Sequence, residues 1–146
     1  MPGPSRAGRA PSPVVRAALL AEMWQVYRRT RVLLRSADLP AAVRELGRLP
    51  TARRAPDVDP VWLGRTTWRR LRWPGGGPVC LDRALVQFAM LSRRGLRPEL
   101  VIGLPRSASD KDAHAWVEID QVDVGPPPGG SGHLPLARYG AGSSRP

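Results

Sequence analysis

With 146 residues, 42% of them hydrophobic, the chain is long enough for one globular domain and too short for two of ordinary size. Its net charge of +11 is uneven, because residues 1–72 hold 15 Arg against five acidic residues and the remainder is nearly neutral. A single cysteine excludes a disulfide within the chain and a four-cysteine zinc site, and no run of 18 apolar residues is present to span a membrane.

The first part of the sequence predicts helices behind a disordered tail at residues 1–12. Over residues 13–34, apolar side chains recur at spacings of three, four and seven, which is the stripe of an amphipathic helix, and arginines occupy the opposite face. A shorter helix is predicted at 40–47, with Asp38 or Leu39 near its N-terminal cap.

A linker at residues 51–60 leads to a third predicted helix at 61–71, where Trp62 and Trp68 stand among arginines. Interleaved Arg and Trp occur in nucleic-acid binders, and a basic half can also meet an anionic membrane or an acidic peptide. Two tryptophans packed inward explain the pattern more simply. Arg outnumbers Lys 22 to 1, which indicates a compositional bias, so charge alone defines no partner.

The second half opens with an interruption of regular structure at residues 74–79, Pro-Gly-Gly-Gly-Pro-Val. A strongly helical stretch follows at 80–94, and Gly95 suits a left-handed residue just past its end. Residues 99–104 read as a strand, and residues 105–112 as a polar loop.

Alternation at residues 113–119 predicts a second strand, with His114, Trp116 and Glu118 on one face. A two-residue turn at Asp120 and Gln121 then leads to a short third strand at 122–124. The remaining residues, rich in Pro and Gly, read as irregular chain with a tail at 141–146. Helices followed by antiparallel strands predict an α+β fold.

The cysteine, Cys80, stands where the glycine-rich loop meets a helix. The first N–H groups of a helix have no partner within it, and the helix dipole places partial positive charge there. A thiol at this point is more easily ionised, and the same N–H groups can hold an oxyanion. Asp82, in the same turn, supports the helix start but opposes ionisation of the thiol.

A cysteine nucleophile needs a base, and the chain offers two histidines. His114 lies on a predicted strand, which positions a base better than a loop does. His133 lies in a glycine-rich segment and reads as ordinary surface. One Cys and one His 34 residues apart are unremarkable by spacing alone.

Three segments closely resemble the protease family of lasso-peptide biosynthesis, a branch of the transglutaminase-like superfamily. They are Cys-Leu-Asp-Arg-Ala-Leu (80–85), Arg-Arg-Gly-Leu-Arg-Pro-Glu-Leu-Val-Ile-Gly (93–103) and Ala-His-Ala-Trp-Val-Glu (113–118), in this order and spacing. The resemblance is specific over residues 73–124. It implies one peptidase domain at 13–140, with N-terminal helices packed on a papain-like core of a cysteine-bearing helix and a small antiparallel sheet.

The same resemblance implies the chemistry. Cys80 would be the nucleophile and His114 its base, cutting a precursor between leader and core in the cytoplasm. Residues 1–72 leave no room for a small leader-binding domain. The implied partners are therefore the precursor leader peptide, a separate leader-binding recognition protein and the macrocycle-forming cyclase. No metal or organic cofactor is expected; ATP used by the assembled machinery would bind elsewhere, since this chain has no phosphate-binding Gly-Lys-Ser/Thr loop.

The third catalytic group is where the sequence departs from the family. The superfamily places an Asp on the strand after the histidine to orient the imidazole. With a two-residue turn, His114 would face residues near Pro126 and Pro127, which cannot do so. Asp123 shares a face with His114 but lies about 13 Å along the strand. Asp123 is the chosen candidate, and Asp120 or a backbone carbonyl remain alternatives.

Three other functions stay open beside the leader peptidase. A transglutaminase-like acyltransferase would pass the same acyl group to an amine instead of water. A non-catalytic scaffold of the maturation complex would keep the fold with an incomplete triad. A nucleic-acid binder would rest only on the basic half, and it is the weakest of the three.

Overall fold

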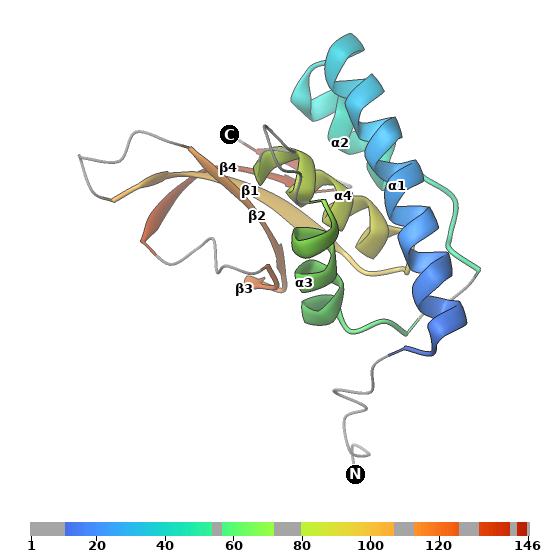
Figure 1. The fold of residues 1–146 in the computed structure, drawn as a ribbon. Coiled ribbons are helices and arrows are strands. Elements are labelled where there is room, and N and C mark those ends of the chain that lie inside the picture. The colour runs from blue at the N-terminus through green and yellow to red at the C-terminus, as the bar shows by residue number, and fades with distance from the viewer. Residues whose placement is uncertain are drawn as a thin grey trace.

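The computed structural model describes residues 11–53, 57–71, 80–106, 113–125, 132–140 and 143–145. Within these ranges, helices precede an antiparallel sheet, so the α+β prediction is confirmed (Figure 1). The helices are α1 (Pro13–Ser36), α2 (Leu39–Gly47), α3 (Pro60–Arg70) and α4 (Cys80–Ser92). The strands are β1 (Pro98–Pro105), β2 (His114–Ile119), β3 (Val122–Asp123), β4 (His133–Gly140) and β5 (Ser143–Arg145).

The first three helices begin in the same way, with a polar N-cap residue followed by proline in the first turn. Asp38 caps α2 by accepting a hydrogen bond from the N–H of Ala41 at 2.9 Å, and Asp59 caps α3 by accepting from Val61 and Trp62. Proline needs no partner at this position, because its missing N–H would be unpaired in any case. The sequence predictions of these helices are confirmed to within a few residues.

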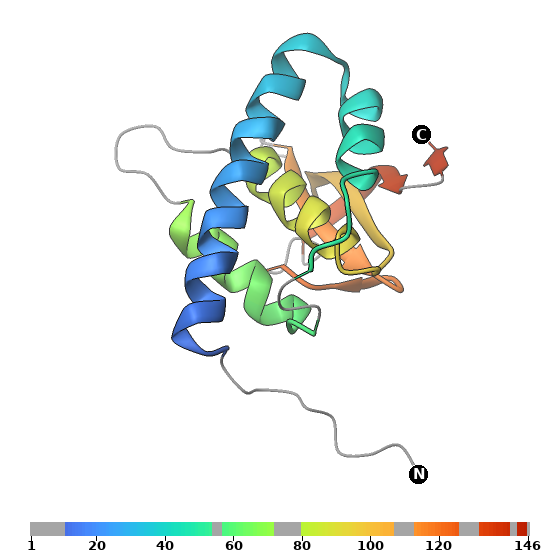
Figure 2. The same ribbon diagram turned by 90° about the vertical axis from the view of Figure 1, so that its right-hand side faces the viewer.

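Helix α4 is the centre of the molecule, lying between the sheet and the other helices (Figure 1; Figure 2). Every residue from Ala84 to Leu91 is buried, so this helix is enclosed on all sides and not along one stripe. The sheet covers it with Leu100 and Val117, and α1 covers it with Leu19 and Met23. The helix ends at Ser92, two residues before the predicted end, and Gly95 takes the expected left-handed conformation at φ 77°.

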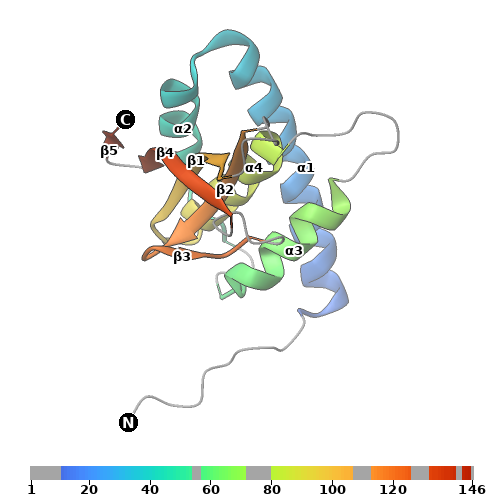
Figure 3. The same ribbon diagram turned by 90° about the vertical axis from the view of Figure 1, so that its left-hand side faces the viewer.

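The sheet has the strand order β3-β2-β1-β4-β5, antiparallel throughout the described strands (Figure 3). Asp120 and Gln121 form the predicted two-residue turn, with φ of 50° and 64°, both in the left-handed region. Ile119 consequently pairs with Val122, and Glu118 with Asp123, which confirms the predicted register.

The prediction of irregular chain after residue 125 is wrong for residues 133–140, which form β4 and pair with β1 along its length. The register shifts between Ile102 and Gly103, where Pro135 lies opposite Gly103 and Leu136 is the extra residue. A bulge is one of the few places where a strand accepts proline. It also breaks the alternation that would have revealed the strand. Strand β5, at residues 143–145, lies in the segment interpreted as a tail.

Helix α3 approaches α4 and the end of β3 most closely at Gly64. A Cβ there would lie 2.5 Å from Nε2 of Gln87 and 2.8 Å from the backbone oxygen of Val124. Gln87 donates a hydrogen bond to that same oxygen at 3.1 Å, which fixes the end of the β2–β3 hairpin to α4. The absence of a side chain at residue 64 therefore sets how closely three elements meet beside the site described below.

We expect Gly64→Ala to lower the free energy of unfolding by about 1–2 kcal/mol, because overpacking outweighs the better helix propensity of alanine. Gly125→Ala is the matched control, since a Cβ there meets only ordinary contacts at 3.5 and 3.7 Å. Urea titration followed by circular dichroism measures both variants. Equal stability of the two would show that the close approach at residue 64 relaxes without cost.

Candidate active site

Cys80 is the first residue of α4, as the sequence predicts, and its side chain is partly buried. Its sulfur lies 3.9 Å from the backbone oxygen of Ala113, within reach of a weak S–H hydrogen bond. The glycine-rich loop predicted at 74–79 lies outside the described residues. The position at a helix N-terminus leaves backbone N–H groups that can hold an oxyanion.

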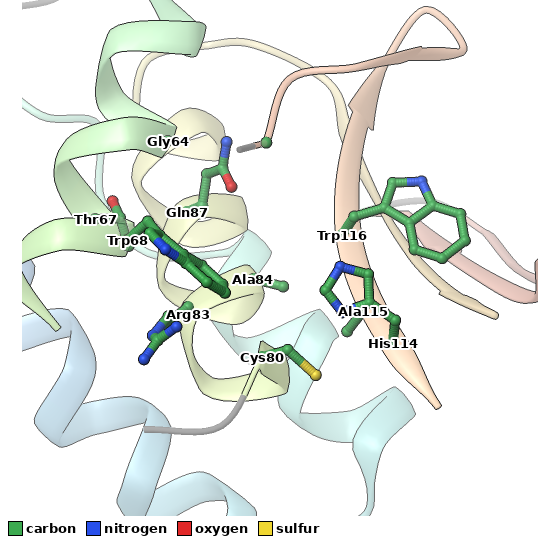
Figure 4. Close-up of a pocket in the computed structure, with 11 residues that line it drawn as sticks. Gly64, Thr67, Trp68, Cys80, Arg83, Ala84, Gln87, His114, Ala115 and Trp116 are labelled. Carbon is green, nitrogen blue, oxygen red and sulfur yellow. The ribbon is translucent and has the colours of Figure 1, made fainter. Parts of the chain in front are cut away.

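His114 is the first residue of β2 and lines the same pocket as Cys80. Figure 4 shows the sulfur of Cys80 pointing toward β2, and the imidazole of His114 turned toward α4. Trp68 of α3 and Arg83 of α4 form part of the opposite wall, with the guanidinium carbon 4.1 Å from the ring centroid. A thiol and an imidazole from two elements of regular structure therefore line one pocket.

Burial of His114 lowers its pKa below the ordinary 6.5, and the negative charge of Asp123 acts in the opposite direction. A lowered pKa means that the imidazole is neutral near pH 7. The neutral form is the one that accepts a proton from a thiol.

Asp123 is the carboxylate whose charge acts on His114, but it lies opposite Glu118, four residues along β2. Its Oδ1 accepts a hydrogen bond from the N–H of Gly125 at 2.9 Å. Asp120, the alternative, stands in the turn at the far end of β2. The structure thus brings Cys80 and His114 together, with Asp123 acting from a distance through its charge.

Asp82 is buried two residues after Cys80, and Arg31 of α1 lies 3.3 Å from its Oδ2. The sequence indicated that the Asp82 charge would oppose ionisation of the thiol. Arg31 lies on a helix 51 residues away in the sequence, and its positive charge partly offsets that of Asp82.

Arg31→Gln is accordingly expected to slow alkylation of Cys80 by iodoacetamide several-fold at pH 7, because removing the Arg31–Asp82 ion pair leaves more of the Asp82 charge acting on the sulfur. Arg28→Gln, one turn away on the same helix, should leave the rate unchanged. Mass spectrometry gives both rates cleanly, because the chain has one cysteine. An effect of similar size in both variants would mean that total charge governs the rate and not the contact with Asp82.

Trp116 and Glu118 follow His114 on the same face of β2 and form a buried network. Nε1 of Trp116 donates to Oε1 of Glu118 at 2.9 Å, and Arg138 of β4 donates to Oε2 at 2.6 Å. Glu118 is 7% exposed, so this network lies inside the protein and links β2 to β4. Without the register of β4, the sequence held no signal for Arg138.

His133 was interpreted as ordinary surface, and the structure places it beside the site. Its ring centroid lies 5.0 Å from that of His114 and 6.0 Å from that of Trp116. No group of three His, Cys, Asp or Glu side chains suited to a metal ion occurs among the described residues. In the same part of the chain, no helix has the length and apolarity to cross a membrane.

A thiol at the start of a central helix, facing an imidazole on an antiparallel sheet, defines the class of papain-like cysteine enzymes. A family model described as the transglutaminase-like superfamily matches residues 17–134, and the chain belongs to that superfamily. Its members are typically cysteine peptidases or acyltransferases. Neither the curated proteins nor the solved structures gave a significant match.

Proposed function

We propose that this chain is a cysteine peptidase that removes the leader from a lasso-peptide precursor in the cytoplasm. The observation that carries the proposal is the pocket shared by Cys80, at the N-terminus of α4, and His114, at the start of β2. Membership in the superfamily supports the thiol chemistry. The resemblance over residues 73–124 to lasso-peptide proteases supports the choice of substrate.

The reaction would proceed through an acyl-enzyme. Cys80 transfers its proton to His114, and its sulfur attacks the carbonyl carbon of the scissile bond. The oxyanion that forms accepts hydrogen bonds from N–H groups at the start of α4. His114 then returns the proton to the leaving amine, and a water molecule, deprotonated by His114, hydrolyses the thioester.

The nature of the products separates this function from its alternatives. Incubation of the chain with a precursor and its leader-binding protein, followed by mass spectrometry, should give two fragments whose summed mass exceeds the precursor by one water. A product joined to an added amine would instead identify an acyltransferase. An unchanged precursor, with Cys80 unreactive toward iodoacetamide, would identify a scaffold.

The proposal includes a separate leader-binding protein, with the cyclase that closes the macrocycle as a further partner. The basic side chains of α1 supply a surface for an acidic leader or partner, where Arg28 and Arg35 are exposed. By sequence, Arg31 belongs to the same basic face of α1, but its contact with Asp82 gives it a structural role. Arg28 and Arg35 are therefore the residues to test.

Reversing both charges, Arg28→Glu with Arg35→Glu, should slow association with the partner more than it speeds dissociation, and added salt should reduce the difference. Arg44→Glu with Arg97→Glu changes the net charge equally at exposed sites on other elements. Interferometry across a salt series measures both rates. Equal slowing by the two pairs would assign the effect to net charge, and tight binding of precursor by the chain alone would remove the need for a partner.

A further inference from the structure

The second histidine of the chain reaches the first across an intervening strand. His114 begins β2 and His133 begins β4, and these strands flank β1 on its two sides. The backbones of two strands that have a third strand between them lie roughly 10 Å apart. The ring centroids of His114 and His133 are only 5.0 Å apart, so a feature of β1 must allow the two rings to meet.

Gly103 of β1 allows the two rings to meet, because it has no side chain. It pairs with His114 on one side and with Pro135 on the other, so its missing side chain would stand between the two strands. A Cβ at residue 103 would lie 2.7 Å from the indole of Trp116 and 2.6 Å from the backbone oxygen of Leu134. The space over Gly103 is filled by the Trp116 indole from β2 and by the backbone of Leu134 from β4. With no side chain on β1 between them, the rings of His114, Trp116 and His133 form one cluster.

We infer that His133 is a positioning residue, whose ring packs with that of Trp116 against His114 and holds the imidazole in place for Cys80. This inference rests on the proposed thiol chemistry but not on the identity of the substrate. Trp116 lies nearly parallel to His114, with ring centroids 6.1 Å apart and an interplanar angle of 24°. Trp116 is itself held by Glu118, and Glu118 by Arg138 of the same strand as His133.

The cluster explains how a histidine at the start of β2 keeps one orientation while Asp123 pairs with Glu118, four residues along the same strand. Among the described residues, the groups that can titrate or carry charge around His114 are Cys80 and Arg83 on α4, Asp123 on β3 and His133 on β4. Of these, His133 contributes a ring surface that both shields the imidazole from water and blocks its rotation away from the pocket.

Two substitutions test the role of the ring. His133→Ala removes it, and His133→Phe keeps its shape without nitrogen atoms. In either variant His114 is the remaining histidine, so its imidazole gives one assignable signal in a proton NMR titration of the untagged chain. The rate of Cys80 alkylation at pH 7 reports on the thiol without any peptide substrate.

For His133→Ala we expect the pKa of His114 to rise toward 6.5, because the ring becomes hydrated, and Cys80 alkylation to slow about tenfold or more, because the base is misplaced. His133→Phe should restore both values to near those of the parent chain. Thermal melting checks that both variants are folded. His114→Ala sets the alkylation rate without any base.

Unchanged values in His133→Ala would overturn the inference, as would a phenylalanine variant as impaired as the alanine variant. The inference and the proposed function fail separately. A parent chain that leaves the precursor intact while His133→Ala shifts both values would refute the substrate and retain the positioning role. Cleavage of the precursor that persists in His133→Ala, with an unchanged pKa of His114, would retain the proposed substrate and refute the positioning role.

Discussion

If the proposed function holds, Cys80→Ala is expected to abolish cleavage of the precursor, with a loss on the order of 10⁴-fold or more, because the chain has no second cysteine to form the thioester. The fold should survive, since alanine is well accepted in the first turn of a helix and the hydrogen bond of the thiol to the backbone oxygen of Ala113 is weak. Far-UV circular dichroism and thermal melting should match those of the parent chain. Cleavage is measured with the leader-binding protein present.

Cys80→Ser is the control for shape. The hydroxyl keeps the size of the thiol and its ability to donate to Ala113, but it is a far weaker nucleophile at neutral pH. Both variants should be inactive. Cleavage by Cys80→Ala at the parent rate would remove the central claim, since the chain contains no second cysteine.

Features set by a few adjacent residues were predictable from the sequence. The start of α2 follows from Asp38 and the proline after it, and the left-handed Gly95 follows from a glycine at a helix end. The β2–β3 register follows from the turn at Asp120 and Gln121 once the turn length is fixed. Each depends on backbone conformations that the local residue types favour.

Features that depend on distant strands were not predictable. Strand β4 was missed because Pro135 and the bulge beside it hide the alternation of a strand. Its register then decides that Arg138 meets Glu118 and that His133 meets His114. The pairing of Arg31 with Asp82 has the same origin, since only the packing of α1 on α4 brings them together.

The site combines both kinds of information. Cys80 and His114 were identified as candidates by the resemblance of the segments around them to a known family. Their common pocket follows from the packing of β2 on α4. The groups that hold them in place come from α1, β1 and β4. Such supporting groups have no fixed sequence distance from the residues they support.

His114→Ala should lower cleavage as far as Cys80→Ala does, and the double variant should show no further loss. Members of one catalytic unit are not additive, because each step requires both the thiol and its base. Single-turnover rates with saturating partner measure the three variants. A double variant clearly slower than either single variant would mean that the two residues act in separate steps.

The carboxylate is tested by Asp123→Asn against Asp120→Asn, in the same hairpin. Asn keeps the shape and tolerates the left-handed conformation of residue 120, so each substitution removes only a charge. Asp123 raises the pKa of His114, so its loss should lower that pKa further and move the acid limb of the rate profile to lower pH. The rate itself should fall by roughly tens to hundreds of fold if Asp123 also orients the imidazole.

Asp120→Asn, the control, should cleave at a rate near that of the parent chain. Full activity in Asp123→Asn with an unmoved acid limb would transfer the orienting role to a backbone group or to the ring cluster around His133.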